Sequence, residues 1–175
     1  MANSALPTRR AALRTGLLLG SAATLSACGF ELRRAPSFAF KTLFTNWADG
    51  SSMGNEFRSA IASNGNVRVI TDAREIATAD VLLDILQDQR EKVVIGVNAS
   101  GGVREFQLRL RCKFRLRGKD GKELIAETEL LQQRDISFNE SAVLSKEAEE
   151  GLLYRNMQSD IVQQLMRRLA AVQSL

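Results

Sequence analysis

Apolar and polar residues alternate without a break from residue 106 to residue 117. The apolar positions are Phe106, Leu108, Leu110, Cys112, Phe114 and Leu116. A period of two is typical of a strand with one face on a core and the other exposed. The pattern therefore predicts a long, half-buried strand. It places Cys112 on the core face, as a small hydrophobic residue.

Turn signals flank this strand on both sides and predict two hairpins. Gly101-Gly102 suits a two-residue turn, which would set Val97 opposite Phe106 and Ala99 opposite Arg104. Residues 118–122 suit a three-residue loop with Gly121 in the left-handed conformation. That second register pairs apolar with apolar residues. It also pairs three cations with acids: Arg117 with Glu123, Lys113 with Glu127 and Arg111 with Glu129.

The remaining elements follow from shorter patterns. Residues 38–44 predict a strand, and apolar residues at helical spacing from Met53 to Ile61 predict a helix that Asn64-Gly65 ends. Residues 67–71 read as a brief extended piece. An apolar run from Val81 to Leu86, followed by a polar interval and then Val93, Ile95 and Val97, supplies another of the long strands. From Leu153 to Leu169 an apolar residue recurs every fourth position, which predicts a C-terminal helix capped by Ser145.

These elements predict an α+β domain, in the order strand, helix, three long strands and helix. The economical arrangement packs two helices on one face of a mixed, mostly antiparallel four-stranded sheet. The first strand runs parallel to a neighbour because a strand–helix–strand crossover connects them. The other face of the sheet is expected to remain charged and available.

The first 27 residues have the composition of an export signal. Three arginines precede a short apolar segment, and Leu25-Ser26-Ala27-Cys28 matches the lipobox of bacterial lipoproteins. We therefore expect residues 1–27 to be a signal peptide, Cys28 to be lipidated, residues 28–36 to be a tether and residues 37–175 to form a single domain. The alternative is a soluble secreted chain with a cysteine near its cleavage site.

Removal of that signal changes what the charge implies. Three of the 24 basic residues and none of the 20 acids would leave, so the net charge falls from +4 to +1. Net charge then indicates no particular partner, and we expect no nucleic acid to bind. The chain has no histidine and no glycine-rich phosphate loop, and a lipidated Cys28 leaves Cys112 without a disulfide partner. We expect no enzyme activity, no cofactor and no metal site.

The exposed face of the central strand carries five cations, and the predicted register leaves two of them unpaired. Arg109 and Arg115 would face Leu131 and Ile125, which makes them the better candidates for binding a phosphate. The alternative is an ordinary solvated sheet face with a ladder of charges, in which cross-strand ion pairs contribute only about 0.2–1 kcal/mol each.

Three segments resemble a known family, the LPS-assembly lipoproteins called LptE. They are LSACGFELR, REFQLRLRCKFRLRGKDGKEL and NESAVLSKEAEEGLLYRNMQSDIVQQLMRRL. The resemblance covers nearly the whole chain after Cys28. It implies two helices on a four-stranded sheet and a lipid anchor in the outer membrane, with the domain facing the periplasm and the barrel lumen. It also implies a non-catalytic 1:1 partner that plugs and helps assemble the LptD β-barrel and binds lipopolysaccharide.

The resemblance also implies where lipopolysaccharide would bind. Lys146, in LSKEAEE, matches a lysine at the start of the last helix to which lipid A phosphate binding is ascribed in relatives. A second basic position, near the tip of the first hairpin, falls close to Ala99, and Arg104 is a hypothetical substitute. The candidate ligand residues are therefore Lys146, Arg104, Arg109 and Arg115. An alternative function is that of a periplasm-facing lipoprotein subunit of a different lipid-transport system.

Overall fold

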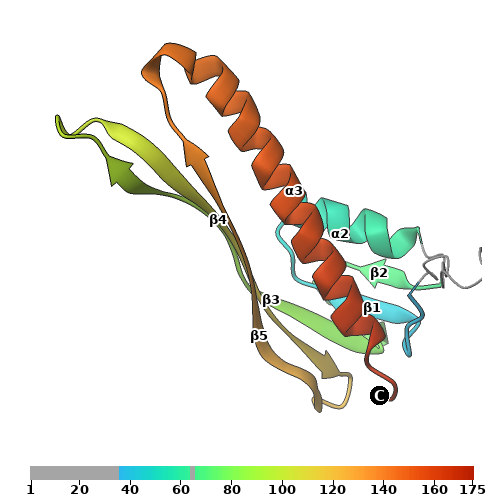
Figure 1. Ribbon diagram of the computed structural model, residues 1–175. Coiled ribbons are helices and arrows are strands. Elements are labelled where there is room, and N and C mark those ends of the chain that lie inside the picture. The colour runs from blue at the N-terminus through green and yellow to red at the C-terminus, as the bar shows by residue number, and fades with distance from the viewer. Residues whose placement is uncertain (1–35, 64–65) are drawn as a thin grey trace, which may run out of the picture. The chain divides into compact units, whose positions relative to one another are not determined.

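A computed structural model describes residues 36–63 and 66–175 (Figure 1). The expected signal peptide, Cys28, most of the tether and the Asn64-Gly65 helix stop lie outside these residues. The strands are β1 (Thr42–Thr45), β2 (Arg68–Ile70), β3 (Val81–Val97), β4 (Val103–Gly118) and β5 (Glu123–Ser137). The helices are α2 (Ser52–Ala62) and α3 (Val143–Ala170), with short 3₁₀ helices η1 (Ala73–Thr78) and η2 (Glu140–Ala142).

The strands form one mixed sheet in the order β2-β1-β3-β4-β5. β1 runs parallel to both β2 and β3, whereas β3, β4 and β5 are antiparallel neighbours. The α+β class and the parallel placement of the first strand are confirmed. The count of four strands is wrong: the brief extended piece at residues 67–71 contains β2, which pairs with β1 through Thr42 and Arg68 and becomes the edge strand.

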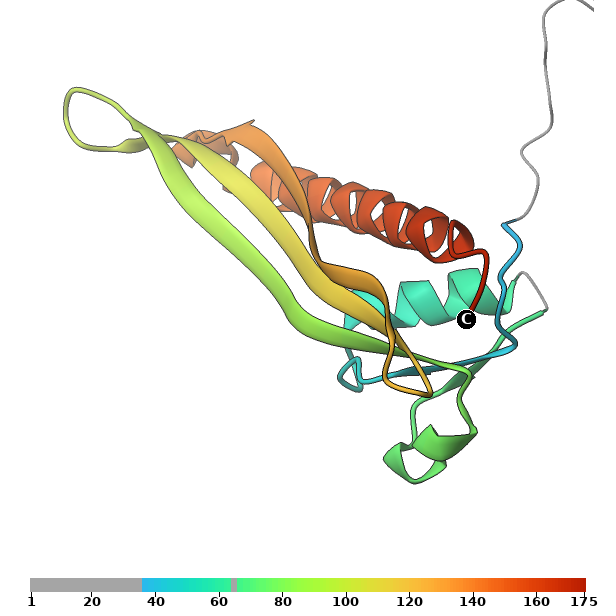
Figure 2. The same cartoon turned by 90° about the horizontal axis from the view of Figure 1, so that it is seen from below.

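Both long helices lie on the same face of the sheet, as the sequence predicts (Figures 1 and 2). Their apolar stripes meet the inward side chains of β4, and Phe57, Phe114 and Leu165 are fully buried. Burial of each large apolar side chain contributes about 1.5–3 kcal/mol. Cys112 lies in this core, where burial and the nearby Asp88 charge raise the pKa of its thiol to about 12.

The start of α3 differs from the expectation. The helix begins at Val143, and Ala142 precedes it without a side-chain cap. Ser145 lies inside the first turn, where its hydroxyl donates to the Ala142 carbonyl at 2.9 Å. Asn139 accepts from the Ser141 amide at 3.0 Å and so begins η2, the turn that leads into the helix.

Both hairpins use the same turn geometry. In the β4–β5 turn the Gly118 amide donates to the Lys122 carbonyl, and Gly121 has φ +85° as predicted. In the β3–β4 turn the Asn98 amide donates to the Gly102 carbonyl, and Gly101 has φ +84°. The predicted two-residue turn is wrong because Gly101, not the Gly101-Gly102 pair, supplies the left-handed residue.

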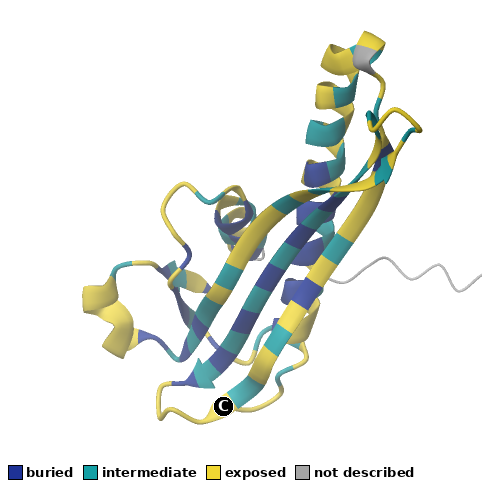
Figure 3. Cartoon of the chain, turned by 90° about the vertical axis from the view of Figure 1, so that its left-hand side faces the viewer, coloured by how far each residue is buried: buried dark blue, intermediate teal, exposed yellow. Residues whose placement is uncertain are grey.

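The strand registers contain bulges that the sequence pattern does not reveal. Val97 pairs with Val103, and Phe106 pairs with Val94 rather than Val97. Beside β5, Arg117 pairs with Glu123 as predicted, but two irregularities then shift the register, so that Phe114 faces Thr128. At a bulge, two residues of one strand lie opposite a single residue of the other, so the pairing beyond the bulge is shifted by one position. The inward and outward alternation of β4 survives these shifts (Figure 3).

Candidate functional site

The outer face of the sheet, away from the helices, carries the five cations of β4 beside acids of both neighbouring strands. Arg111 contacts Glu129 at 2.8 Å and Lys113 contacts Glu127 at 2.5 Å, so these two predicted ion pairs form despite the shifted register. Long side chains reach diagonal neighbours, which compensates for the bulges. Arg117 instead contacts Asp84 of β3 at 2.8 Å.

Asp84 also contradicts the expectation that Arg115 is unpaired. The Nε atoms of Arg115 and Arg117 each donate to Asp84 Oδ2 at 2.8 Å, and Arg117 Nη2 donates to Oδ1 at 3.1 Å. Burial of Asp84 opposes its ionisation, but hydrogen bonds and positive charge from Arg117 and Arg115 outweigh burial, so its pKa is lowered. The partner was missed because it comes from β3, and the register predicted from the Gly101-Gly102 turn was wrong. With the observed turn and the bulge at Leu86, Asp84 pairs with Arg115.

Arg109 lies farther along the same face. Its guanidinium donates to Gln107 Oε1 at 2.7 Å, and in the register it faces Gln133 of β5 and Glu91 of β3 rather than Leu131. This face of the sheet has cations along its centre and acids on both flanks, so its charges are largely balanced. Arg109 and Arg115 lie on this outer face, whereas α3 lies on the other one. Both arginines remain candidate ligand residues.

Lys146 and Arg104 lie at the other candidate position, the end of the sheet where α3 begins. Lys146 Nζ donates to Ser137 Oγ at 3.0 Å and contacts Glu149 at 2.9 Å, and 23% of its side chain is exposed. Arg104 lines a hollow of about 310 Å³ with Asn139 and Ser141. Phe138 lines this hollow and also a smaller one beside Lys146, so the two hollows are neighbours that share one wall.

Exposed apolar side chains gather at the same end. Leu144 is 83% exposed at the start of α3, and Val94, Ile95 and Val97 are exposed on the β3–β4 hairpin. We call the set Val94, Val97, Arg104, Phe138, Leu144 and Lys146 the amphiphilic end. Apolar patches beside cations suit a ligand that carries both acyl chains and anionic groups.

Lys92 is a functional candidate that the sequence argument missed. Its Nζ contacts Glu150 at 2.6 Å and lies 4.3 Å from the centre of the Phe106 ring, and it lines the hollow beside Lys146. A period of two counted from Val81 would place Lys92 on the outer face, but the bulge at Leu86 turns it to the helix-facing side of β3, opposite Leu108. Its approach to α3 depends on packing that the pattern does not specify.

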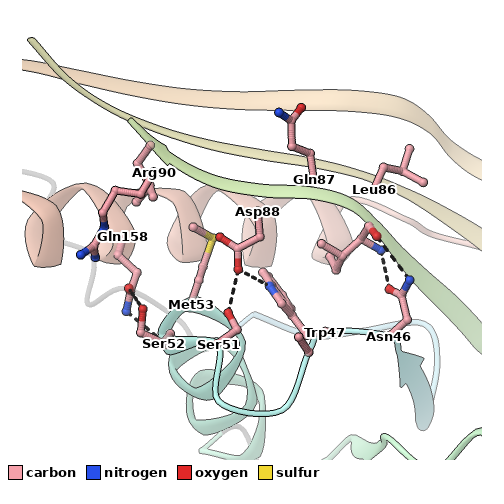
Figure 4. A pocket seen from close by; sticks show the side chains of 13 residues that line it. Asn46, Trp47, Ser51, Ser52, Met53, Leu86, Gln87, Asp88, Arg90 and Gln158 are labelled. Carbon is pink, nitrogen blue, oxygen red and sulfur yellow. Dashed lines mark hydrogen bonds between the residues drawn. The ribbon is translucent and has the colours of Figure 1, made fainter. Parts of the chain in front are cut away.

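A larger hollow, also unforeseen, lies between β3 and the start of α2 (Figure 4). It has a volume of about 520 Å³, with Trp47 and Met53 on its apolar side. Asp88 accepts hydrogen bonds from Trp47 Nε1 at 2.9 Å and Ser51 Oγ at 2.7 Å. Gly54 fits here because a Cβ atom would lie 2.8 Å from Trp47 Cγ.

Within the described residues, no helix is both long enough and apolar enough to cross a membrane. The C-terminal helix has sufficient length, but charged residues interrupt its sequence throughout.

Comparisons with known proteins identify the family. The solution NMR structure of an uncharacterized lipoprotein B from Nitrosomonas europaea is 30% identical, with a TM-score of 0.67 over 82% of this chain and 91% of that one. Rare lipoprotein B from Shewanella oneidensis is 17% identical, with a TM-score of 0.61 over 75% and 95%. A minor lipoprotein from Acinetobacter baumannii is 19% identical, with a TM-score of 0.58 over 77% and 94%.

The last two structures are too distant in sequence to show more than the shared fold. A search of curated proteins found no match. The model of the LptE family, described as lipopolysaccharide-assembly, matches residues 40–169 and so covers most of the chain, including every described strand and both long helices apart from the last residue of α3. The chain therefore belongs to the LptE family of lipopolysaccharide-assembly proteins.

Proposed function

We propose that this protein is an outer-membrane lipoprotein, anchored through Cys28, that plugs and helps to assemble an LptD-type β-barrel in a 1:1 complex. It binds lipopolysaccharide during delivery to the cell surface, without catalysis and without a cofactor. Family membership supports the role in lipopolysaccharide transport. The structures of lipoproteins with the same fold support a lipid anchor, because Cys28 occupies a lipobox at a short distance before the domain.

The observation that carries the ligand half of this proposal is the composition of the amphiphilic end. Lipid A combines negatively charged phosphates with acyl chains. Lys146 and Arg104 can donate charge-assisted hydrogen bonds to phosphate, while Leu144, Val94 and Val97 offer apolar contacts. A phosphate would replace Glu149 as the partner of Lys146, which requires only a side-chain rotation because both groups are partly exposed.

Arg109 and Arg115 have a weaker claim to the ligand. Arg115 already shares Asp84 with Arg117, and Arg109 is held by Gln107. A phosphate would have to compete with these contacts before it could bind either arginine. We therefore assign lipid A phosphate binding to Lys146 and Arg104, with Arg109 and Arg115 as secondary candidates.

The test is lipopolysaccharide binding by the variants Lys146→Gln and Arg104→Gln, with Lys122→Gln as a matched control in the β4–β5 turn at the opposite end of the sheet. Loss of one charge-assisted hydrogen bond costs about 1.5–3 kcal/mol, so each of the first two variants should bind roughly tenfold more weakly or worse. Titration with purified lipopolysaccharide, measured by fluorescence or calorimetry, gives the dissociation constants.

Dephosphorylated lipopolysaccharide is the second probe. It should bind the unmodified protein at least as weakly as intact lipopolysaccharide binds either single variant, because it loses the contacts of both Lys146 and Arg104. Equal binding of intact lipopolysaccharide by all three variants, or equal binding of both probes by the unmodified protein, would contradict the assignment.

A further inference from the structure

The edge of β3 that faces away from β4 is open over most of its length. β1 pairs with β3 only from Val81 to Leu83, although β3 continues to Val97. Across residues 36–63 and 66–175, no strand pairs with β3 on this side beyond Leu83. An open edge presents unpaired backbone N–H and C=O groups, which can form hydrogen bonds with another extended chain.

Asn46 shows how this edge accepts a partner. Where β1 ends, the Asn46 side chain accepts from the Ile85 amide at 2.6 Å and donates to the Ile85 carbonyl at 3.3 Å. The amide thus imitates one residue of a further strand (Figure 4). The chain then turns away into α2, and the 520 Å³ hollow opens beside β3, between Asn46–Met53 and Ile85–Arg90.

The segment beyond Asn46 is regular enough to template a strand. Register shifts occur at Ile85/Gln87 and at Val94/Gly96, and between them Gln87–Val94 pairs with β4 without interruption. Edge strands that avoid pairing usually carry bulges or charged side chains pointing inward. Here the bulges bound the open segment instead of interrupting it, but Arg90 and Lys92 do point to the helix-facing side, opposite Leu110 and Leu108. A strand could therefore add here only if it neutralised these charges.

The charges along this segment indicate what the partner should carry. Lys92 is neutralised by Glu150. Arg90 lies 4.1 Å from the centre of the Tyr154 ring, is exposed, and forms no ion pair with any carboxylate in the described part of the chain. A carboxylate on an added strand, on the side that faces α3, would form an ion pair with Arg90.

We propose that the Gln87–Val94 edge of β3 binds an extended segment of the barrel partner, which adds a strand to the sheet and places an acidic side chain on Arg90. This mode of recognition draws affinity from main-chain hydrogen bonds and specificity from alternate side chains. It rests on the proposed function for the identity of the partner. The hollow beside Trp47 and Met53 receives the inward side chains of the added strand.

Amide hydrogen exchange tests this, measured by mass spectrometry or NMR on the lipidated protein alone and in its purified complex with the barrel. In an antiparallel strand every second amide points to each edge. Alone, about half of the amides of residues 87–94 should therefore exchange fast, whereas in the complex they should slow by about tenfold or more. The amides of β4, already paired on both sides, serve as the internal reference.

The variant Arg90→Glu adds a second reading, with Arg155→Glu on the exposed face of α3 as the matched control. Arg90→Glu should accelerate dissociation of the complex by about tenfold and restore fast exchange at residues 87–94, because it sets two acids against each other. Arg155→Glu should leave both quantities unchanged. Circular dichroism confirms that both variants fold.

The outcomes separate this proposal from the proposed function. A barrel that co-purifies without slowing exchange at residues 87–94 overturns strand addition alone. Absence of any barrel overturns the proposed function together with this proposal. Slowed exchange that appears in the isolated protein and grows with its concentration would assign the edge to a second copy of the chain, and would also overturn the proposal.

Discussion

At the residue scale, Asp84 stands out among the acids near the β4 cations because it contacts two of them, Arg115 and Arg117. Only 13% of its side chain is exposed. Sequence alone predicted acids for Arg111 and Lys113, because these come from the adjacent hairpin strand. It did not predict Asp84, since that pairing depends on where the Leu86 bulge and the first turn set the register of β3.

The substitution Asp84→Asn should destabilise the protein by about 2–3 kcal/mol at pH 7, because two half-buried guanidinium groups lose their charged acceptor. The pKa of Asp84 is lowered in the folded state, so its contribution is complete above the unfolded value of about 3.9 and is lost as the pH falls through the folded pKa. Denaturant unfolding from pH 7 to pH 2 should therefore show the difference between the two proteins beginning to narrow below about pH 4.

Glu127→Gln is the control for this change. Glu127 also pairs with a β4 cation, but 54% of its side chain is exposed, and such pairs contribute below about 1 kcal/mol. Similar destabilisation in both variants, or a difference for Asp84→Asn that does not change at all between pH 7 and pH 2, would show that charge on Asp84 is not the cause.

At the element scale, the strands and helices follow from hydrophobic periodicity, and the connections do not follow as well. The β4 alternation, the α3 stripe and the Gly121 turn were all predictable from local sequence. The β3–β4 turn and the bulges were not, because several registers satisfy the same period-two pattern. β2 was underestimated because three residues are too few to distinguish a strand from an extended loop.

Two glycine substitutions should change stability in opposite directions. Gly121 has φ +85° with open space around it, so Gly121→Ala should cost about 1–2 kcal/mol through backbone strain alone. Gly151 lies inside α3, where an added Cβ would make only ordinary contact, so Gly151→Ala should gain about 0.5–1 kcal/mol.

Thermal or denaturant unfolding of both variants gives the comparison directly. Because the two substitutions add the same methyl group, the difference in sign isolates the backbone conformation as the cause. Equal effects of either sign would show that the left-handed turn does not hold Gly121 in the folded protein.

At the scale of the whole molecule, the core and the proposed ligand site lie in different parts of the fold. The core lies between the sheet and the two helices. The amphiphilic end brings together Arg104 from β4 and Lys146 from α3, which are 42 positions apart in the sequence. The sequence indicated both residues only through the family resemblance. Phe138, which links their hollows, carried no signal of its own because an isolated aromatic after a strand is common in any core.

The open edge of β3 is likewise a property of the assembled sheet. The sequence predicts a long strand at residues 81–97 and a short one at residues 38–44. It does not say whether these two strands are neighbours in the sheet. Once β1 is placed next to β3, the difference in their lengths leaves the edge from Gln87 onward uncovered. Unequal strand lengths are thus the sequence signal from which such an edge could be inferred.

The proposed function makes this protein the lipid-anchored partner of a lipopolysaccharide-export barrel. Affinity purification of the acylated protein from its own outer membrane, followed by mass spectrometry and gel quantification of what accompanies it, tests that claim most directly. We expect a large β-barrel of the LptD type in roughly equal amount, retained through detergent washing. Recovery of the protein without any such barrel, or with the components of a different lipid transporter, would contradict it.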